Sequence, residues 1–111
     1  MNIEQKDLVL LPYPFIDLEN SKVRPALVVS NEVFNKNSRD RIMIPLTSVL
    51  SEVTHSIFIT QESLQSGKLV KPSRIRADKI FSVEQGKIIM KIGKLKDPVF
   101  DKVRAELLKV F

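Results

Sequence analysis

Short runs of apolar and β-branched residues recur along the 111-residue chain, and proline, glycine or polar residues close each run. Such runs are typical of β-strands, because an amphipathic helix needs a longer periodic segment to bury one face. The predicted strands are Asp7–Phe15, Ala26–Val29, Arg41–Leu46, His55–Thr60, Ile75–Val83 and Lys87–Leu95. A sheet of about six short strands therefore dominates the expected fold.

The segments between these strands carry polar residues or helical signals. Ile16–Val23 has no periodic apolar face and is predicted to be a polar loop of the kind that often forms a lid. Ser30–Asp40 is predicted to be a helical turn or a loop. Gln61–Gly67 is predicted to contain one helical turn closed by its glycine, and Glu84–Gly86 is predicted to be a turn.

The C-terminal segment changes to a helical period. Asp97 is the predicted N-cap, and Pro98 suits the first helical position. The apolar side chains that follow define one face of an amphipathic helix; they are Val99, Phe100, Val103, Leu107 and Phe111. The expected fold is mostly β with α (α+β): one domain spanning residues 1–111, in which a C-terminal helix packs a small, mostly antiparallel barrel or sheet.

Basic side chains outnumber acidic ones. Eighteen Lys and Arg residues against thirteen Asp and Glu residues give a formal net charge of +5 at pH 7. Long-range attraction of this sign favours polyanionic or acidic-peptide partners. Many small soluble proteins carry a similar charge without binding nucleic acid, so charge alone does not select a function.

The sequence has no cysteine and one histidine, His55. Disulfides and thiolate chemistry are therefore excluded, and a single imidazole without a carboxylate at ligand spacing predicts neither a metal site nor a cofactor. The N-terminus has no basic segment followed by an apolar run, and no stretch approaches the roughly 18 apolar residues of a membrane span. The expected location is the cytoplasm, with no membrane partner.

Polar residues stand at the ends of the predicted strands. Arg24 precedes one strand, and Thr47 and Ser48 follow another. Arg76 and Asp78 lie two residues apart in a third, on the same side of the strand. Each group also has an ordinary structural interpretation: a solvated arginine, hydroxyls that close a turn, and a surface ion pair.

Several short motifs occur in a characteristic order. They are Lys6-Asp7-Leu8-Val9-Leu10 with Pro14-Phe15, Arg24-Pro25-Ala26-Leu27-Val28-Val29, Pro45-Leu46-Thr47-Ser48, Lys71-Pro72-Ser73 with Arg76-Ala77-Asp78-Lys79-Ile80, and Lys91-Ile92-Gly93-Lys94-Leu95. Each motif is weak by itself, but their order and spacing together are specific. With them the chain resembles the MazF/PemK family of type II toxin endoribonucleases, from about Lys6 to the C-terminal helix.

The resemblance implies a dimeric, SH3-like barrel that cleaves single-stranded messenger RNA at short sequences without a metal ion. It also implies that a cognate antitoxin with an acidic or amphipathic tail silences this homodimer, in a complex that binds DNA. In that family the arginine of the Arg-Pro pair and the threonine after the third strand are catalytic, which correspond to Arg24 and Thr47. Other members use an Arg-x-Asp pair, which corresponds to Arg76 and Asp78.

These residue types suit RNA cleavage by the substrate's own 2′-hydroxyl. A guanidinium matches two phosphate oxygens at once, so Arg24 and Arg76 fit the stabilisation of the charge that develops around phosphorus. Thr47 can donate one hydrogen bond to a phosphate oxygen. Arginine does not deprotonate, so Asp78 is the better candidate for the general base, although neighbouring arginines would lower its pKa and weaken it as a base.

Further residues are predicted to bind the substrate. Lys71 and Lys79 belong to a basic run that can follow a phosphate backbone or simply form a solvated face. Tyr13 can stack on a base, and the lone His55 is expected to have a structural or RNA-contacting role. The neighbours of the motif residues complete the predicted set: Pro25, Ser48 and Ser73.

Two other functions are compatible with the same elements. A related barrel toxin poisons DNA gyrase by contact, but Lys109–Phe111 lacks the Trp-Gly-Ile ending associated with that activity. A non-catalytic barrel would bind RNA through its basic face without cleaving it. The ordered set of arginines, threonine and aspartate favours the endoribonuclease.

Overall fold

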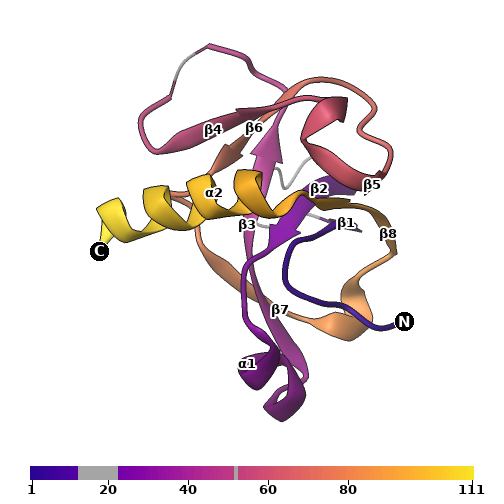
Figure 1. The fold of residues 1–111 in the computed structure, drawn as a ribbon. Coiled ribbons are helices and arrows are strands. Elements are labelled where there is room, and N and C mark those ends of the chain that lie inside the picture. Colours follow the sequence, from indigo (N-terminus) through magenta and orange to yellow (C-terminus); the bar gives the residue numbers. More distant parts are fainter. Residues whose placement is uncertain (13–22, 52) are drawn as a thin grey trace.

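The computed structural model describes residues 1–12, 23–51 and 53–111. Within these residues it contains a curled antiparallel sheet of eight strands, two α-helices and two short 3₁₀ helices (Figure 1). The strands are β1 (Asp7–Pro12), β2 (Val23–Val28), β3 (Asp40–Thr47), β4 (Ser56–Ile59), β5 (Leu64–Gly67), β6 (Ser73–Arg76), β7 (Phe81–Glu84) and β8 (Met90–Leu95). The helices are α1 (Glu32–Asn37), η1 (Gln61–Ser63), η2 (Gln85–Lys87) and α2 (Asp97–Val110).

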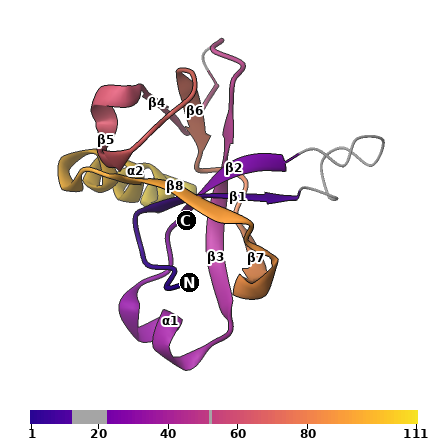
Figure 2. The same cartoon turned by 90° about the vertical axis from the view of Figure 1, so that its right-hand side faces the viewer.

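Strand β3 is the longest of the described strands and joins the two halves of the sheet. On one side it pairs with β2, where Ala26 lies opposite Pro45. On the other side it pairs with β7 along its first half and with β6 at Leu46 and Thr47. The order is β4-β6-β3-β2-β1-β8-β5, with β7 beside β3. Figure 2 shows β3 running from α1 at one end of the molecule to the β4 and β6 region at the other.

Two apolar clusters fill the two sides of the curled sheet. Successive residues of a strand point to opposite faces, so Leu27 and Ile44 enter the first cluster while Val28 and Met43 enter the second. Helix α2 covers the first cluster and contributes its two buried side chains, Phe100 and Val103. Strands β2 and β3 are thus buried on both faces, as the continuous apolar run Ala26–Val29 predicts.

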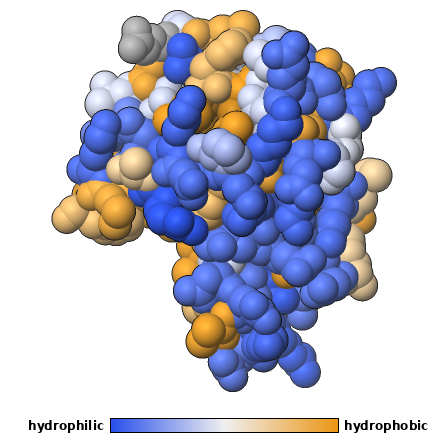
Figure 3. Space-filling model, in the orientation of Figure 1, coloured by the Kyte–Doolittle hydropathy of each residue, from blue (hydrophilic) through white to orange (hydrophobic). Residues whose placement is uncertain are grey.

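The outer surface in the view of Figure 3 is mostly hydrophilic. Its hydrophobic areas include a first one at the top, over β4 and the connection that leads into it, and a second one where α2 ends. Exposed apolar residues in these regions include Leu50 and Phe58 in the first, and Leu108 and Phe111 in the second. Neither area forms part of the two internal clusters.

The predicted fold class, mostly β with a C-terminal helix, is confirmed, but the predicted single strand Ile75–Val83 is wrong. This segment contains the end of β6 and the start of β7, separated by residues 77–80. Both strands pair with β3, and the gap between the two paired stretches of β3 contains Pro45. A proline has no N–H to donate to a neighbouring strand, which favours an interruption of the ladder at this point.

Two further predictions are partly wrong. The segment Gln61–Gly67 begins with the predicted helical turn, η1, but continues as strand β5, which pairs with β8. The predicted strand Lys87–Leu95 begins only at Met90, because Gln85–Lys87 form η2. In the first case Leu64 is the one apolar side chain of the strand apart from its glycine, and in the second the apolar run Ile88-Ile89-Met90 continues across the boundary.

Helix α2 begins at Asp97, so the predicted N-cap is displaced by one residue and Lys96 occupies that position. The Asp97 carboxylate instead accepts a hydrogen bond from Lys6 Nζ at 2.8 Å.

The predicted loop Ile16–Val23 lies mostly outside the described residues, because residues 13–22 are not among them; Val23 itself begins β2. No helix among the described residues has both the length and the apolar character needed to cross a bilayer.

Gly67 permits the close approach of β5 and β8. Its φ is +86°, and a Cβ built on it would lie 2.2 Å from the carbonyl oxygen of Ile92. Gly67→Ala is therefore expected to lower the free energy of unfolding by more than about 2 kcal/mol, since the left-handed backbone and the clash both oppose a methyl group. Gly86→Ala is the control, because its nearest neighbour would be the flexible Glu84 side chain at 3.4 Å. Urea unfolding measures both; equal losses would contradict the expectation.

Candidate active site

The C-terminal end of β3 borders a cavity of about 270 Å³. Its polar lining residues are Arg24 of β2, Thr47 of β3, Arg76 of β6 and Lys79. Its remaining walls come from Pro45, Leu46 and Val49. The structure therefore brings together three of the four predicted catalytic residues, while Asp78 is not among the residues that line this cavity.

Strand pairing explains why these side chains meet. Strands β2 and β3 are antiparallel with Ala26 opposite Pro45, and the same register brings Arg24 level with Thr47. Thr47 lies opposite Arg74 of β6, and Arg76, two residues along that strand, points to the same face as Arg74. Three neighbouring strands thus supply polar side chains to one cavity.

Thr47 keeps a hydroxyl proton available to the cavity. Its Oγ1 accepts a hydrogen bond from the backbone N–H of Val49 at 3.2 Å. This is the turn contact expected of a hydroxyl residue at the end of a strand. A hydroxyl that accepts in this way can still donate its own O–H. The turn contact is therefore compatible with a hydrogen bond from Thr47 to a bound anion.

Asp78 binds Arg76 through both carboxylate oxygens. Arg76 Nε donates to Oδ1 at 2.9 Å, and Nη2 donates to Oδ2 at 2.7 Å. Hydrogen bonding to this guanidinium lowers the pKa of Asp78 below its ordinary value of 3.8. The same contact raises the pKa of Arg76. Asp78 consequently holds a cationic side chain of the cavity in place and is a poor proton acceptor at neutral pH.

Positive charge dominates the cavity. Arg76 is paired with Asp78, whereas no described carboxylate forms an ion pair with Arg24 or Lys79. Guanidinium and ammonium groups that lack an internal counter-ion attract an anion from solution. Together with the Thr47 hydroxyl, they form a site suited to a phosphate group.

A second cavity of about 490 Å³ adjoins the first, because Arg24 lines both. It contains four of the predicted substrate-binding residues, Pro25, Ser48, Lys71 and Ser73. Its other walls are apolar and come from Leu10, Val23, Leu46, Leu69, Val70 and Ile92. Cations beside an apolar wall suit a ligand that has both an anionic group and a flat apolar part.

Residues 4–111 match the model of a protein family described as the PemK-like, MazF-like toxin of type II toxin-antitoxin systems. The chain belongs to this family. The resemblance predicted from the sequence motifs is thereby confirmed. A comparison with curated protein sequences finds no match.

Solved structures of similar fold include an endoribonuclease in complex with its cognate antitoxin from Mycobacterial species, with a TM-score of 0.77 and 17% identity over 98% of this chain and 94% of that chain. The Mycobacterium tuberculosis toxin MazF-mt6 has a TM-score of 0.75 and 16% identity over 95% of each chain. A MazE-MazF structure from Deinococcus radiodurans has a TM-score of 0.77 and 18% identity over 97% and 94% of the two chains. The likeness establishes a MazF-like fold.

In this MazF-like fold, His55 lines neither of these two cavities. His55 stands before β4 with a positive φ of 60°. Its Nδ1 lies 3.4 Å from Oε2 of Glu106 on α2, so it connects the β3–β4 segment to the helix. Tyr13 lies outside the described residues. No group of three or more histidine, aspartate or glutamate residues in the described ranges is arranged to hold a metal ion.

Two residues that line the cavities are absent from the sequence motifs by which the chain resembles the MazF-like toxins. Val49 lines the first cavity and Val70 lines the second, and both are exposed apolar residues. Val49 follows Thr47 by two residues, and Val70 directly precedes Lys71. Their nearness to predicted site residues is the signal that sequence reasoning could have used.

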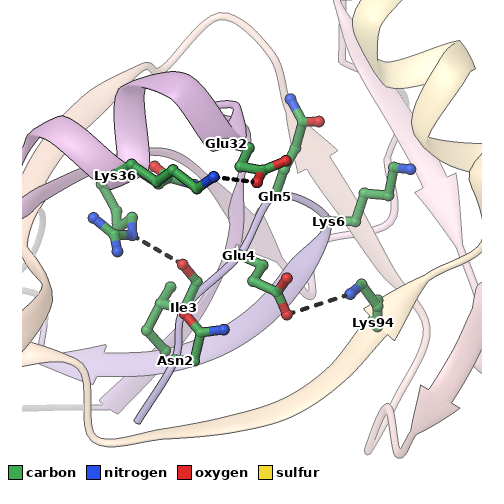
Figure 4. Close-up of a pocket in the computed structure, with 10 residues that line it drawn as sticks. Asn2, Ile3, Glu4, Gln5, Lys6, Glu32, Lys36 and Lys94 are labelled. Atoms are coloured by element: carbon green, nitrogen blue, oxygen red, sulfur yellow. Dashed lines mark hydrogen bonds and ion pairs between the residues drawn. The ribbon is translucent and has the colours of Figure 1, made fainter.

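Another cavity lies near the start of β3, between the N-terminal segment and α1 (Figure 4). Its charged side chains are already paired: Lys36 with Glu32 at 2.8 Å, and Lys94 with Glu4 at 3.9 Å. The buried guanidinium of Arg41 donates to carbonyl oxygens of the N-terminal segment and of the α1–β3 connection. These groups stabilise the fold, so the candidate active site of the MazF-like toxin is the cavity at the other end of β3.

The Arg76–Asp78 pair predicts an acid-shifted titration. In a ¹³C NMR titration the pKa of Asp78 should lie below 3.8, and Arg76→Met should raise it, since this guanidinium is the main cause of the shift. Because the folded-state pKa is depressed, the pair stabilises the fold above the unfolded-state pKa, and this contribution is lost as the pH falls through the folded value. Arg39→Met, which removes an exposed charge elsewhere, is the control. An Asp78 pKa that Arg76→Met leaves unchanged would contradict the assignment.

Proposed function

We propose that this chain is a metal-independent, sequence-selective endoribonuclease that cleaves single-stranded RNA as the toxin of a type II toxin–antitoxin pair. The observation that carries the proposal is the cavity in which Arg24, Thr47 and Arg76 meet. Membership of the MazF-like family supports it, as does the similar fold of a protein described as an endoribonuclease.

The proposed reaction needs no nucleophile from the protein. The 2′-oxygen of a ribose attacks the adjacent phosphorus, and the bond between phosphorus and the 5′-oxygen breaks. One proton leaves the 2′-hydroxyl and another reaches the 5′-oxygen, so the products are a 2′,3′-cyclic phosphate and a 5′-hydroxyl end. Catalysis then consists of positioning the phosphate and stabilising the extra negative charge of the phosphorane.

Arg24 and Arg76 have the chemistry to bind the non-bridging phosphate oxygens, because each guanidinium can donate two parallel hydrogen bonds. The Thr47 hydroxyl donates a further hydrogen bond to the same phosphate. Lys79 adds a point charge at the rim of the cavity and attracts the RNA backbone. Since Asp78 aligns Arg76 before the substrate binds, this guanidinium can stabilise the transition state at little reorganisation cost.

Asp78 is proposed to position Arg76 rather than to act as the general base. Both of its oxygens already accept hydrogen bonds from Arg76, and that contact lowers its pKa. The described lining of the cavity includes no carboxylate or imidazole, and we propose that water takes the proton of the 2′-hydroxyl. Water is a weak base at neutral pH, so a modest rate is expected.

The second cavity is proposed to hold a nucleotide beside the cleaved bond. Arg24 lies at the junction of the two cavities, so a phosphate bound there directs the neighbouring base toward the apolar walls. Ser48 and Lys71 are available for polar contacts with that nucleotide, whereas the buried Ser73 hydroxyl donates to the carbonyl oxygen of Lys71. Base-edge contacts of this kind would select the RNA sequence.

A cognate antitoxin is the proposed partner. The Mycobacterial endoribonuclease is described in complex with its cognate antitoxin, and the Deinococcus radiodurans structure is described as MazE-MazF. The net charge of +5 suits an acidic or amphipathic inhibitory tail.

A cytoplasmic homodimer is proposed as well, for which the exposed Leu108 and Phe111 at the end of α2 offer apolar surface. The complex with the antitoxin is proposed to bind DNA.

Purified protein is expected to cleave long RNA in the presence of EDTA and to leave DNA intact, because DNA lacks the attacking hydroxyl. Mapping of the new 5′ ends should show 5′-hydroxyl groups at a recurrent short sequence. An oligonucleotide with one 2′-deoxy residue at the cleavage site is the control and should stay uncut. Absence of cleavage across diverse RNA sequences, or equal cleavage of DNA, would contradict the proposal.

Thr47→Val is expected to lower kcat by about 10²- to 10³-fold, the usual effect of removing one donor to a developing oxyanion. Arg24→Met should cost at least as much, since a charged donor is lost. Thr54→Val is the matched control, because this exposed hydroxyl lies outside both cavities. Steady-state kinetics on a short RNA, with binding to a 2′-deoxy analogue, separate turnover from affinity. Unchanged turnover in Thr47→Val would remove the threonine from the mechanism.

A further inference from the structure

Arg74 is a half-buried arginine on β6 that the proposed mechanism does not use. It lies opposite Thr47 of β3 on one side and opposite Phe58 of β4 on the other. It is absent from the lining of the cavity that contains Thr47. Arg74 is therefore a neighbour of Thr47 in the sheet, but its side chain does not line the cavity.

The guanidinium of Arg74 joins the beginning of the β3–β4 connection to the first residue of β4. Its Nε donates to the carbonyl oxygen of Leu50 at 3.2 Å, and its Nη1 donates to Ser56 Oγ at 3.4 Å. Its Cζ lies 5.6 Å from the centroid of the Phe58 ring, within the range of a cation–π contact. Ser56 Oγ in turn donates to the carbonyl oxygen of Val53 at 2.5 Å. One side chain thus makes three contacts with the connection and the strand that follows it.

The first residues of that connection belong to the candidate site. Val49 lines the cavity, and its backbone N–H donates to Thr47 Oγ1 at 3.2 Å. The position of the Val49 amide therefore sets the direction in which the Thr47 hydroxyl can donate its own proton. Leu50, the next residue, is the one that Arg74 holds. A loss of that hydrogen bond frees the segment that orients Thr47.

We propose that Arg74 is a positioning residue: it fixes the start of the β3–β4 connection so that the Val49 amide orients the Thr47 hydroxyl toward the scissile phosphate. The inference rests on the proposed RNA cleavage, and it assigns Arg74 an effect on turnover rather than on RNA affinity. Small misplacements of a catalytic group are costly, so loosening this segment is expected to lower kcat by about 10- to 100-fold.

The experiment compares Arg74→Met, Arg74→Lys and Arg39→Met. Met keeps the apolar stem but removes the hydrogen bonds, while Lys keeps the charge but lacks the planar fork that reaches Leu50 and Ser56 together. Both are expected to lower kcat with KM changed by less than about threefold. Arg39→Met removes an exposed arginine near the start of β3 and should leave kcat and KM unchanged. Ser56→Ala removes the hydrogen bond from Arg74 and the one to the Val53 carbonyl oxygen but leaves the Arg74–Leu50 contact, so it should give an intermediate loss. It serves as the test if Arg74→Met does not fold.

Hydrogen exchange of the Val49 amide provides a readout that does not depend on cleavage. Exchange should be equally fast in the wild type and in Arg39→Met, and at least about tenfold faster than either in Arg74→Met, because the segment that holds this amide is then free to open. Unchanged Val49 exchange in Arg74→Met would overturn the inference even if the protein cleaved no RNA. A raised KM in Arg74→Met with full recovery in Arg74→Lys would also overturn it, since Arg74 would then bind phosphate through its charge alone.

Discussion

Strand β3 is the element on which both the core and the candidate site depend. It pairs with β2 on one edge and with β7 and β6 on the other, and its side chains enter the apolar clusters on both faces. A strand held on four sides has little freedom, so Thr47 at its end is fixed relative to Arg24 and Arg76. The cavity is therefore a consequence of strand pairing, and a rigid sheet positions the side chains that the proposed reaction uses.

Of the cationic side chains that line this cavity, only one has a carboxylate partner among the described residues, and the resulting excess of positive charge suits the binding of a phosphodiester. Arg76 is oriented by Asp78, whereas Arg24 and Lys79 have no ion-pair partner among the described residues. A phosphate would meet one guanidinium that is already aligned and two cations whose charge it can neutralise. The cavity near α1 differs, because its lysines are paired with carboxylates.

The motifs were sufficient to predict which residues of β2 and β3 lie together at the cavity, because Arg24-Pro25 and Pro45-Leu46-Thr47-Ser48 are local in the sequence and lie at strand ends. The division of Ile75–Val83 into two strands was not predictable from that segment. Its alternation changes at Asp78-Lys79 and Ile80-Phe81, but neither pair contains a proline or glycine that would mark the end of a strand, and the gap lies beside Pro45, on another strand. Strand β5 was missed for a related reason, since its pairing with β8 is long-range and only Leu64 within it is buried.

By itself, the sequence determined the fold class, the two-sided burial of Ala26–Val29, the amphipathic closing helix and the residue types available for chemistry. Only the tertiary structure decided how those residues are used: Asp78 engages Arg76 with both oxygens, His55 contacts Glu106, and the guanidinium of Arg74 holds a connection. The physical reason is that local preference sets where strands form, whereas the order of strands in a sheet arises from long-range pairing. Residues far apart in the chain share a cavity only after β3 has acquired partners on both edges.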